Sequence, residues 1–117
     1  MKKVRVVLSP EAEEVYQHLN KEAPTSKTER MILKAINKKV ELIKINHHYG
    51  NPIAKELIPQ EYKEKYGVKN LFRVELPSYW RMLYTLTDGE IEIEIIAFIL
   101  EFIDHPTYDK KFGYRKK

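Results

Sequence analysis

Apolar and polar residues alternate in three successive runs between Asn70 and Phe102, which predicts three antiparallel strands. Asp88-Gly89 separates the last two runs, and this dipeptide favours a two-residue hairpin loop. Shifting the register by one residue would turn Glu92 and Glu94 into the core, so we expect the register to be well specified. A hairpin closed at Asp88-Gly89 gives four pairs on one apolar face: Leu86–Ile91, Tyr84–Ile93, Met82–Ile95 and Trp80–Ala97.

The first of the three runs, Leu71–Leu76, also alternates between apolar and charged residues. The next loop must have a length that keeps the apolar residues of both strands on the same face. A two-residue loop would place Val74 opposite Arg81 and mix the two faces. A three-residue loop at 77–79 places Val74 opposite Met82 and keeps the apolar residues together.

The same register assembles charged side chains on the second face of the sheet. Glu75 lies opposite Arg81, and Arg73 lies opposite Leu83. Arg73 and Arg81 are therefore expected to be diagonal neighbours with Glu75 beside both.

Two amphipathic helices are predicted upstream of these strands. Lys3–Leu8 has the β-branched composition of a strand, and Ser9 with Pro10 is a good start for a helix running to about Asn20. Ser26 and Glu29 form a capping box that begins a second helix. The buried stripes are predicted to be Ala12, Val15, Tyr16 and Leu19 in the first helix, and Ile32, Leu33, Ile36, Val40 and Ile43 in the second.

The second helix is predicted to end at about Asn46, and the short link between the helices favours an antiparallel helical hairpin. Lysines, among them Lys34, Lys38 and Lys39, lie outside its apolar stripe. This basic face is typical of solvated surface, and binding of nucleic acid is the alternative interpretation.

The segment from His47 to Gly67 is less regular. His47 and His48 are adjacent and rarely converge on one ion, so we interpret them as part of the helix C-terminus rather than as metal ligands. Ile53–Ile58 is compatible with a short strand or a helical turn. Gln60–Tyr66 is predicted to be a short helix that ends at Gly67.

Basic and aromatic residues alternate in the C-terminal segment, which is predicted to be a short helix or a tail. This mixture suits a phosphate chain with stacked bases, although terminal basic residues can also serve only solubility. The RNA-binding candidates are Lys110, Lys111, Tyr114 and Arg115.

With 117 residues and a net charge of +4, the chain is expected to form a single α+β domain spanning residues 1–117, in which the helical hairpin packs on a curved antiparallel sheet. It has no cysteine, which excludes disulfides and thiolate chemistry. No signal peptide or uninterrupted apolar span is recognisable, so a cytoplasmic protein that does not bind membranes is expected.

The succession of a strand, a helical hairpin and a three-stranded meander resembles the RelE/ParE superfamily of type II toxin–antitoxin toxins. The motifs that carry the likeness are short: Phe72-Arg73-Val74-Glu75, Trp80-Arg81-Met82-Leu83-Tyr84, Asp88-Gly89, and Asp104-His105 followed by Tyr108. The likeness covers almost the whole chain in order, except Ile53–Tyr66, which has no counterpart that we can assign.

The resemblance implies a RelE-like toxin that cuts mRNA on the ribosome, inhibits translation, needs no metal or other cofactor, and is blocked by a cognate antitoxin protein. Arg73 and Arg81 match basic positions of the family, where cations stabilise charge on the scissile phosphate. His105 matches a position that carries His or Lys, and an imidazole ordinarily titrates near neutrality, which suits a proton carrier. Tyr108 is the candidate for the aromatic hydroxyl, with Tyr114 as its alternative.

Two residues depart from the family pattern and keep another interpretation open. Glu75 stands where cleaving members carry a second cation, and Pro106 follows His105 where a basic residue is common. The alternative is a non-catalytic or ParE-like binding protein on the same fold, acting through protein or RNA binding. A free-standing RNA-binding module is the third hypothesis, and charge alone supports it.

Overall fold

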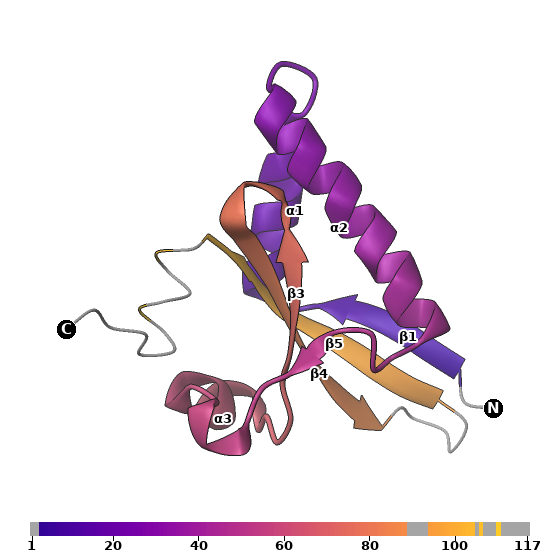
Figure 1. Cartoon of the computed structure of the whole chain (residues 1–117), viewed down its shortest axis with the longest axis vertical. Helices are drawn as coiled ribbons and strands as arrows, with labels where there is room; N and C mark the ends of the chain where they lie inside the picture. The colour runs from indigo at the N-terminus through magenta and orange to yellow at the C-terminus, as the bar shows by residue number, and fades with distance from the viewer. Residues whose placement is uncertain (1–2, 89–93, 105, 107–109, 111–117) are drawn as a thin grey trace.

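The computed structural model describes residues 3–88, 94–104, 106 and 110, and it shows an α+β arrangement around a five-stranded sheet (Figure 1). The strand order is β1-β5-β4-β3-β2. In chain order the elements are β1 (Lys3–Leu8), α1 (Pro10–Glu22), α2 (Lys27–Ile45), β2 (Asn51–Pro52), the 3₁₀ turn η1 (Lys55–Leu57), α3 (Gln60–Tyr66), β3 (Phe72–Leu76), the 3₁₀ turn η2 (Pro77–Tyr79), β4 (Trp80–Asp88) and β5 (Glu94–Ile103).

Both long helices begin at the predicted caps. The Ser9 hydroxyl accepts a hydrogen bond from the Ala12 amide at 3.0 Å and donates one to the Leu100 carbonyl at 2.6 Å. The Ser26 hydroxyl accepts from the Glu29 amide at 3.5 Å and also contacts the Glu29 carboxylate. Side-chain capping of this kind satisfies amides that the first helical turn leaves without partners.

The sheet is mixed, so the expectation of an antiparallel sheet holds for β2 to β5 but not for β1. β1 pairs with β5 in parallel, from Lys3 opposite Glu94 to Leu8 opposite Ile99. A parallel pair needs a long crossover connection, and the chain between β1 and β5 contains α1, α2 and α3. β1 therefore extends the meander on the far side of β5.

The predicted register of β3 and β4 is confirmed. Val74 lies opposite Met82, and Glu75 lies opposite Arg81. The connection is the predicted three-residue loop, in which Ser78 and Tyr79 have φ of 59° and 63°. Two consecutive residues other than glycine in the left-handed region store strain of about 1–3 kcal/mol each.

The predicted register of β4 and β5 is wrong. Leu86 lies opposite Ala97 instead of Ile91, and Asp88 belongs to the strand, opposite Ile95. The connection is therefore longer than two residues, and the register also changes between Leu83 and Tyr84. The other predicted pairs, Tyr84–Ile93, Met82–Ile95 and Trp80–Ala97, fail too, because Tyr84 faces Ile99 and Met82 faces Phe102.

A long-range effect explains this shift. The observed register lets β5 pair with β4 as far as Ile103, whereas the predicted one would leave the end of β5 without a partner. Ile99, Leu100 and Phe102 are buried in the observed arrangement. Burying each of these large side chains is worth about 1.5–3 kcal/mol, which outweighs the preference for a tight turn. At Leu86 and Tyr84 the shift is six residues, an even number, so both keep their predicted face.

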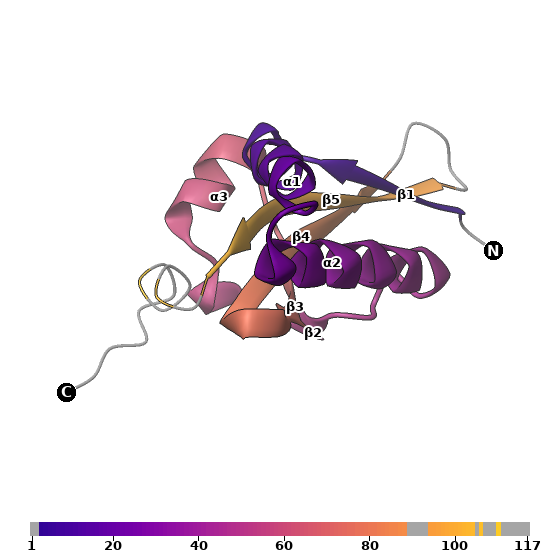
Figure 2. The same ribbon diagram turned by 90° about the horizontal axis from the view of Figure 1, so that it is seen from above.

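The helical hairpin covers one face of the sheet, as predicted. α1 contacts β5, and α2 contacts β1 and β3 (Figure 2). The buried residues of this first core are Ala12, Leu19, Ile32, Ile36, Ile43, Phe72, Val74, Leu76, Met82, Tyr84, Ala97, Ile99 and Phe102.

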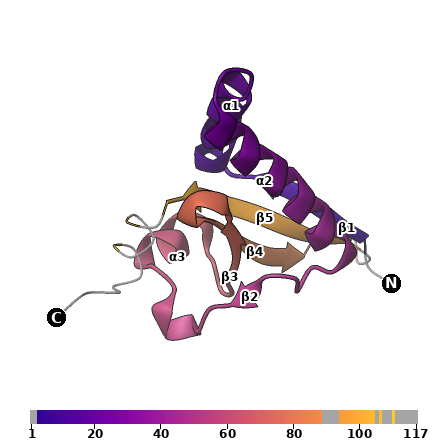
Figure 3. The ribbon, with the colours of Figure 1, turned by 45° about the horizontal axis from the view of Figure 1, so that its top comes forward.

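A second core lies on the opposite face, under α3 and the segments around it (Figure 3). α3 ends at Gly67, as predicted, where φ of 63° favours a residue without a Cβ. The segment 53–66 had no assigned role from the sequence, and the structure shows that it covers part of this face. The buried residues are Ile58, Tyr62, Val68, Leu71, Leu83, Leu100 and Ile103.

Candidate functional site

Arg73, Glu75 and Arg81 form a continuous charged row on the face opposite the helical hairpin. The two oxygens of the Glu75 carboxylate lie 3.2 Å from Arg73 Nε and 3.4 Å from Arg81 Nε. One carboxylate therefore bridges two guanidinium groups from neighbouring strands. We name this arrangement the Arg–Glu–Arg row, and its three members lie together as the β3–β4 register predicts.

The two arginines differ in how they are held. The Arg81 side chain is 13% exposed, the Arg73 side chain 29%, and the Glu75 side chain 54%. Arg81 also donates a hydrogen bond from a terminal nitrogen to the carbonyl of Tyr79 at 2.9 Å. Arg81 thus links the strained η2 turn to the row and has the more fixed position.

A groove of about 300 Å³ adjoins the Arg73 end of the row. It lies beside β3 beyond the short pairing with β2, which involves only Asn51 and Pro52. We call it the β3-edge groove. Its lining residues are Lys39, Tyr49, Gly50, Asn51, Arg73, Val74 and Glu75.

Tyr84 fixes the loop that forms one wall of this groove. Its buried hydroxyl accepts a hydrogen bond from the Gly50 amide at 2.9 Å and donates one to the His47 carbonyl at 2.8 Å. Burial raises the pKa of Tyr84, so it remains a neutral phenol that can donate. At Gly50, a Cβ atom would come within 2.9 Å of the Tyr84 ring and 3.1 Å of the Arg73 carbonyl, so only glycine fits this approach.

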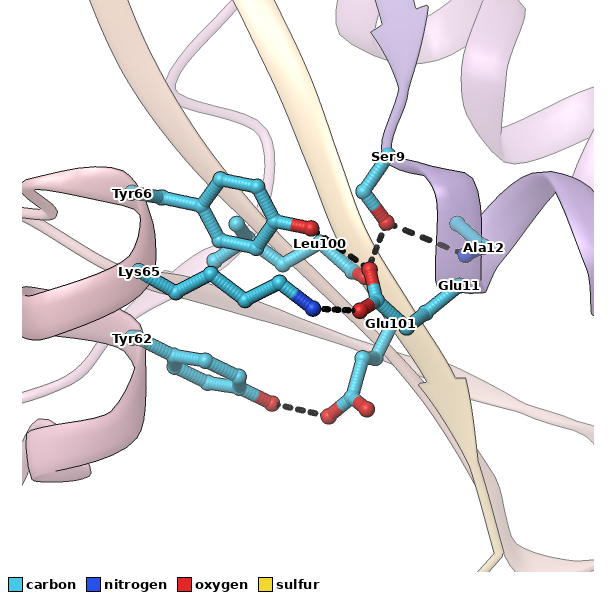
Figure 4. A network of polar contacts seen from close by, with 8 residues as sticks. All are labelled: Ser9, Glu11, Ala12, Tyr62, Lys65, Tyr66, Leu100 and Glu101. Atoms are coloured by element: carbon cyan, nitrogen blue, oxygen red, sulfur yellow. Dashed lines mark hydrogen bonds and ion pairs between the residues drawn. The ribbon is translucent and has the colours of Figure 1, made fainter.

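Polar contacts fasten α3 to the rest of the fold (Figure 4). Tyr62 donates to Glu101 in β5 at 2.5 Å, and Tyr66 donates to Glu11 in α1 at 2.5 Å. Lys65 forms an ion pair with Glu11. Hydrogen bonds from Lys65 and then Tyr66 lower the pKa of Glu11 from 4.5 to about 2. Burial, reinforced by the bond to Glu101, raises the pKa of Tyr62. These contacts anchor α3 to α1 and to β5.

A larger hollow of about 500 Å³ lies between the 66–70 segment and the end of β4. Asn70 uses its side chain there in place of a neighbouring strand: its oxygen accepts from the Leu86 amide at 2.8 Å, and its nitrogen donates to the Leu86 carbonyl at 3.1 Å. Thr85 donates to the Asn70 carbonyl at 2.7 Å. These bonds satisfy the edge of β4 beside the hollow, whose charged lining residues are Lys69 and Asp88.

The structure brings together some of the predicted site residues. Arg73 and Arg81 lie in the Arg–Glu–Arg row, and Lys110 is exposed. The predicted residues His105, Tyr108, Lys111, Tyr114 and Arg115 lie outside the described residues. Within the described ranges, no cluster of three or more potential metal ligands is found.

Sequence reasoning missed Tyr49 and Gly50 as parts of this site. Their turn-forming neighbours, Asn46 and Pro52, indicated a loop, but its position beside β3 depends on the tertiary bond from Tyr84 to the chain around Gly50. Lys39 was recognised only as a member of a basic helix face. The one usable signal was an isolated glycine after an aromatic residue, which is too common to mark a site.

Comparison with known protein families, curated proteins and solved structures gives no match for this chain. In the part of the chain that the structure describes, none of the helices has the length and apolar character needed to cross a membrane.

Proposed function

We propose that this protein is a RelE-like toxin that inhibits translation by cutting mRNA on the ribosome without a metal ion. The resemblance stated above gives the proposal its reaction. The element order of the fold and the Arg–Glu–Arg row support it. The observation that carries it is the convergence of Arg73 and Arg81, from two strands, on one carboxylate.

Such a row suits phosphodiester cleavage because the reaction builds negative charge on the phosphate. Guanidinium groups that are already fixed in place stabilise that charge without reorganising during the reaction. Arg81 meets this requirement best, since its side chain is largely buried and held by both Glu75 and Tyr79. Arginine also presents a planar set of donors that matches phosphate oxygens.

Glu75 has two opposing effects in this proposal. Its carboxylate holds both guanidinium groups in register, and it also cancels part of their positive potential. A phosphate that approaches the row must therefore share Arg73 and Arg81 with Glu75. General acid–base catalysis is assigned to His105 and Tyr108, from the resemblance alone.

Glu75 also supports a second candidate function, a non-catalytic or ParE-like binding protein. A row already neutralised by its own carboxylate serves as a rigid cross-strand tie at least as well as a phosphate site. In both cases we propose that a cognate antitoxin covers this face, with a segment that folds on binding. mRNA on the ribosome is the other partner only in the first case.

The test is mRNA cleavage in a translating extract, read by primer extension. We expect wild-type protein to cut, and Arg81→Ala to cut about 10²–10³-fold more slowly, as when one oxyanion donor is removed. Removing His105, a proton carrier, should reduce the rate by about 10²–10⁴-fold. Glu75→Gln should cut as fast as the wild type or faster, because it removes the negative charge that competes with the phosphate, while the Tyr79 carbonyl still holds Arg81.

Lys38→Ala is the matched control, because Lys38 is an exposed cation on α2 outside the groove lining. Thermal unfolding of each variant distinguishes lost chemistry from lost fold. If neither the wild type nor Glu75→Gln cuts mRNA while both are folded, the nuclease is rejected and the binding protein is the remaining candidate.

A further inference from the structure

We propose that the β3-edge groove is a subsite for one nucleotide of single-stranded RNA, with its base against Tyr49 and its phosphate toward Lys39 and Arg73. This inference rests on the proposed function in its choice of ligand. It adds a binding site that the resemblance does not assign and that lies at one end of the Arg–Glu–Arg row.

Tyr49 provides the surface for a base. Its side chain is 37% exposed, although aromatic rings of this size are usually more completely buried. Lys39 Nζ lies 3.1 Å from the Tyr49 hydroxyl and 5.5 Å from the ring centroid, so the ring is held from one side by a cation. An exposed ring beside a fixed cation is the combination with which proteins bind single-stranded nucleic acids.

The backbone that carries the Tyr49 ring is held in position before any ligand binds. The Tyr49 amide donates to the Asn46 carbonyl at 2.9 Å, and the next residue, Gly50, is tied to Tyr84. The lack of a Cβ at Gly50 lets this backbone approach β3 closely. Because the backbone at Tyr49 and at Gly50 is already held by hydrogen bonds, little conformational entropy is lost when a base stacks on the ring.

The charges of the groove are arranged for a phosphate chain that continues along the row. Lys39 and Arg73 both line the groove, and among the described residues that line it Glu75 is the one with a carboxylate. Arg73 contacts Glu75, which in turn contacts Arg81, so the cations of the groove lead directly to the proposed reaction centre. A strand whose base occupies the groove can therefore place a neighbouring phosphate over Arg81.

The volume favours a small planar ligand with a charged group. At about 300 Å³ the groove is at the lower limit of ordinary ligand sites. An acidic peptide would use Lys39 and Arg73 but would gain nothing specific from an aromatic ring. RNA uses both features, and this is the reason for choosing it.

The experiment measures binding of a fluorescent six-nucleotide 2′-O-methyl RNA by polarisation, since this analogue lacks the hydroxyl that cleavage requires. We expect Tyr49→Leu to weaken binding about tenfold, the loss of one stacked base. Tyr49→Phe keeps the ring and should remain within about twofold of the wild type. Lys39→Gln should weaken binding and reduce the salt dependence by about one charge, whereas Lys38→Gln should change neither.

Two further ligands identify what the ring recognises. An abasic six-unit phosphate chain should bind more weakly than RNA and should not respond to Tyr49→Leu. Poly-glutamate should likewise be insensitive to this substitution. Equal affinity of the wild type and Tyr49→Leu for RNA would overturn the subsite. Loss of RNA affinity that is matched on the abasic chain or on poly-glutamate would overturn it as well.

This result is separable from the nuclease test. If the wild type fails to cut mRNA but shows the expected binding pattern, the catalytic proposal fails and the subsite stands. If the wild type cuts but Tyr49→Leu binds and cuts normally, the subsite fails and the nuclease stands.

Discussion

The two faces of the sheet differ in what they are made of and in how far they depend on distant parts of the chain. One face packs on the helical hairpin and carries an apolar core. The other face carries two different features: a second apolar core that α3 covers, and the Arg–Glu–Arg row on β3 and β4. α3 therefore packs on one part of this face, and the Arg–Glu–Arg row lies outside the apolar core that it covers.

The largest expected effect tests whether both faces are true cores. Met82 and Leu83 are consecutive in β4, are both 0% exposed, and belong to opposite cores. Truncating either to alanine should lower the free energy of unfolding by about 2–5 kcal/mol, because each leaves a cavity. Urea denaturation measures both. A cost below about 1 kcal/mol for Leu83→Ala alone would mean that α3 only loosely covers its face.

A smaller effect is expected for the polar anchor of α3. Tyr62→Phe removes the hydrogen bond to the Glu101 carboxylate, and bonds to charged groups contribute about 1.5–3 kcal/mol. The same denaturation experiment should show this loss, with mRNA cleavage unchanged at temperatures where the variant is folded. Tyr16→Phe, which removes an exposed bond to Asn37, is the matched control and should cost less. Equal losses of stability in Tyr62→Phe and Tyr16→Phe would contradict a special contribution of the Tyr62–Glu101 hydrogen bond to anchoring α3.

The smallest effect concerns pH and the Glu11 contact. Because the folded pKa of Glu11 is about 2, below its ordinary value of 4.5, its charged form stabilises the fold. This stabilisation is present above pH 4.5 and is lost as the pH falls from about 4.5 to 2. The difference in stability between wild type and Glu11→Gln should therefore shrink over that range, as measured by urea unfolding at pH 6, 4 and 3. A difference that is constant with pH would contradict the assigned contact.

The sequence was most informative where neighbouring elements determine the structure. The requirement that the apolar residues of two adjacent strands share one face predicted the three-residue loop and the contact of Glu75 with Arg81. Caps at Ser9 and Ser26 predicted where the helices begin. In these cases the deciding interactions are local, so a pattern along the chain contains them.

The sequence was least informative where contacts with a distant segment determine the structure. The Asp88-Gly89 signal was overridden because β5 gains pairing as far as Ile103 and also pairs with β1. The alternation of β4 and β5 fixes which face a side chain occupies, but not which residue lies opposite. The hydrogen bonds of Tyr84 to Gly50 and His47 hold the loop that carries Tyr49 beside β3. No local sequence pattern predicts such long-range bonds.

The central claim, that the halves of the second face have different functions, is tested most directly by cleavage of mRNA per mole of folded protein. The two variants to compare are Arg81→Ala and Tyr62→Phe, with folded protein determined by urea unfolding. We predict that Arg81→Ala loses about 10²–10³-fold in cleavage, whereas Tyr62→Phe loses stability and keeps the wild-type rate. Equal cleavage by both variants after correction for folding would contradict the claim.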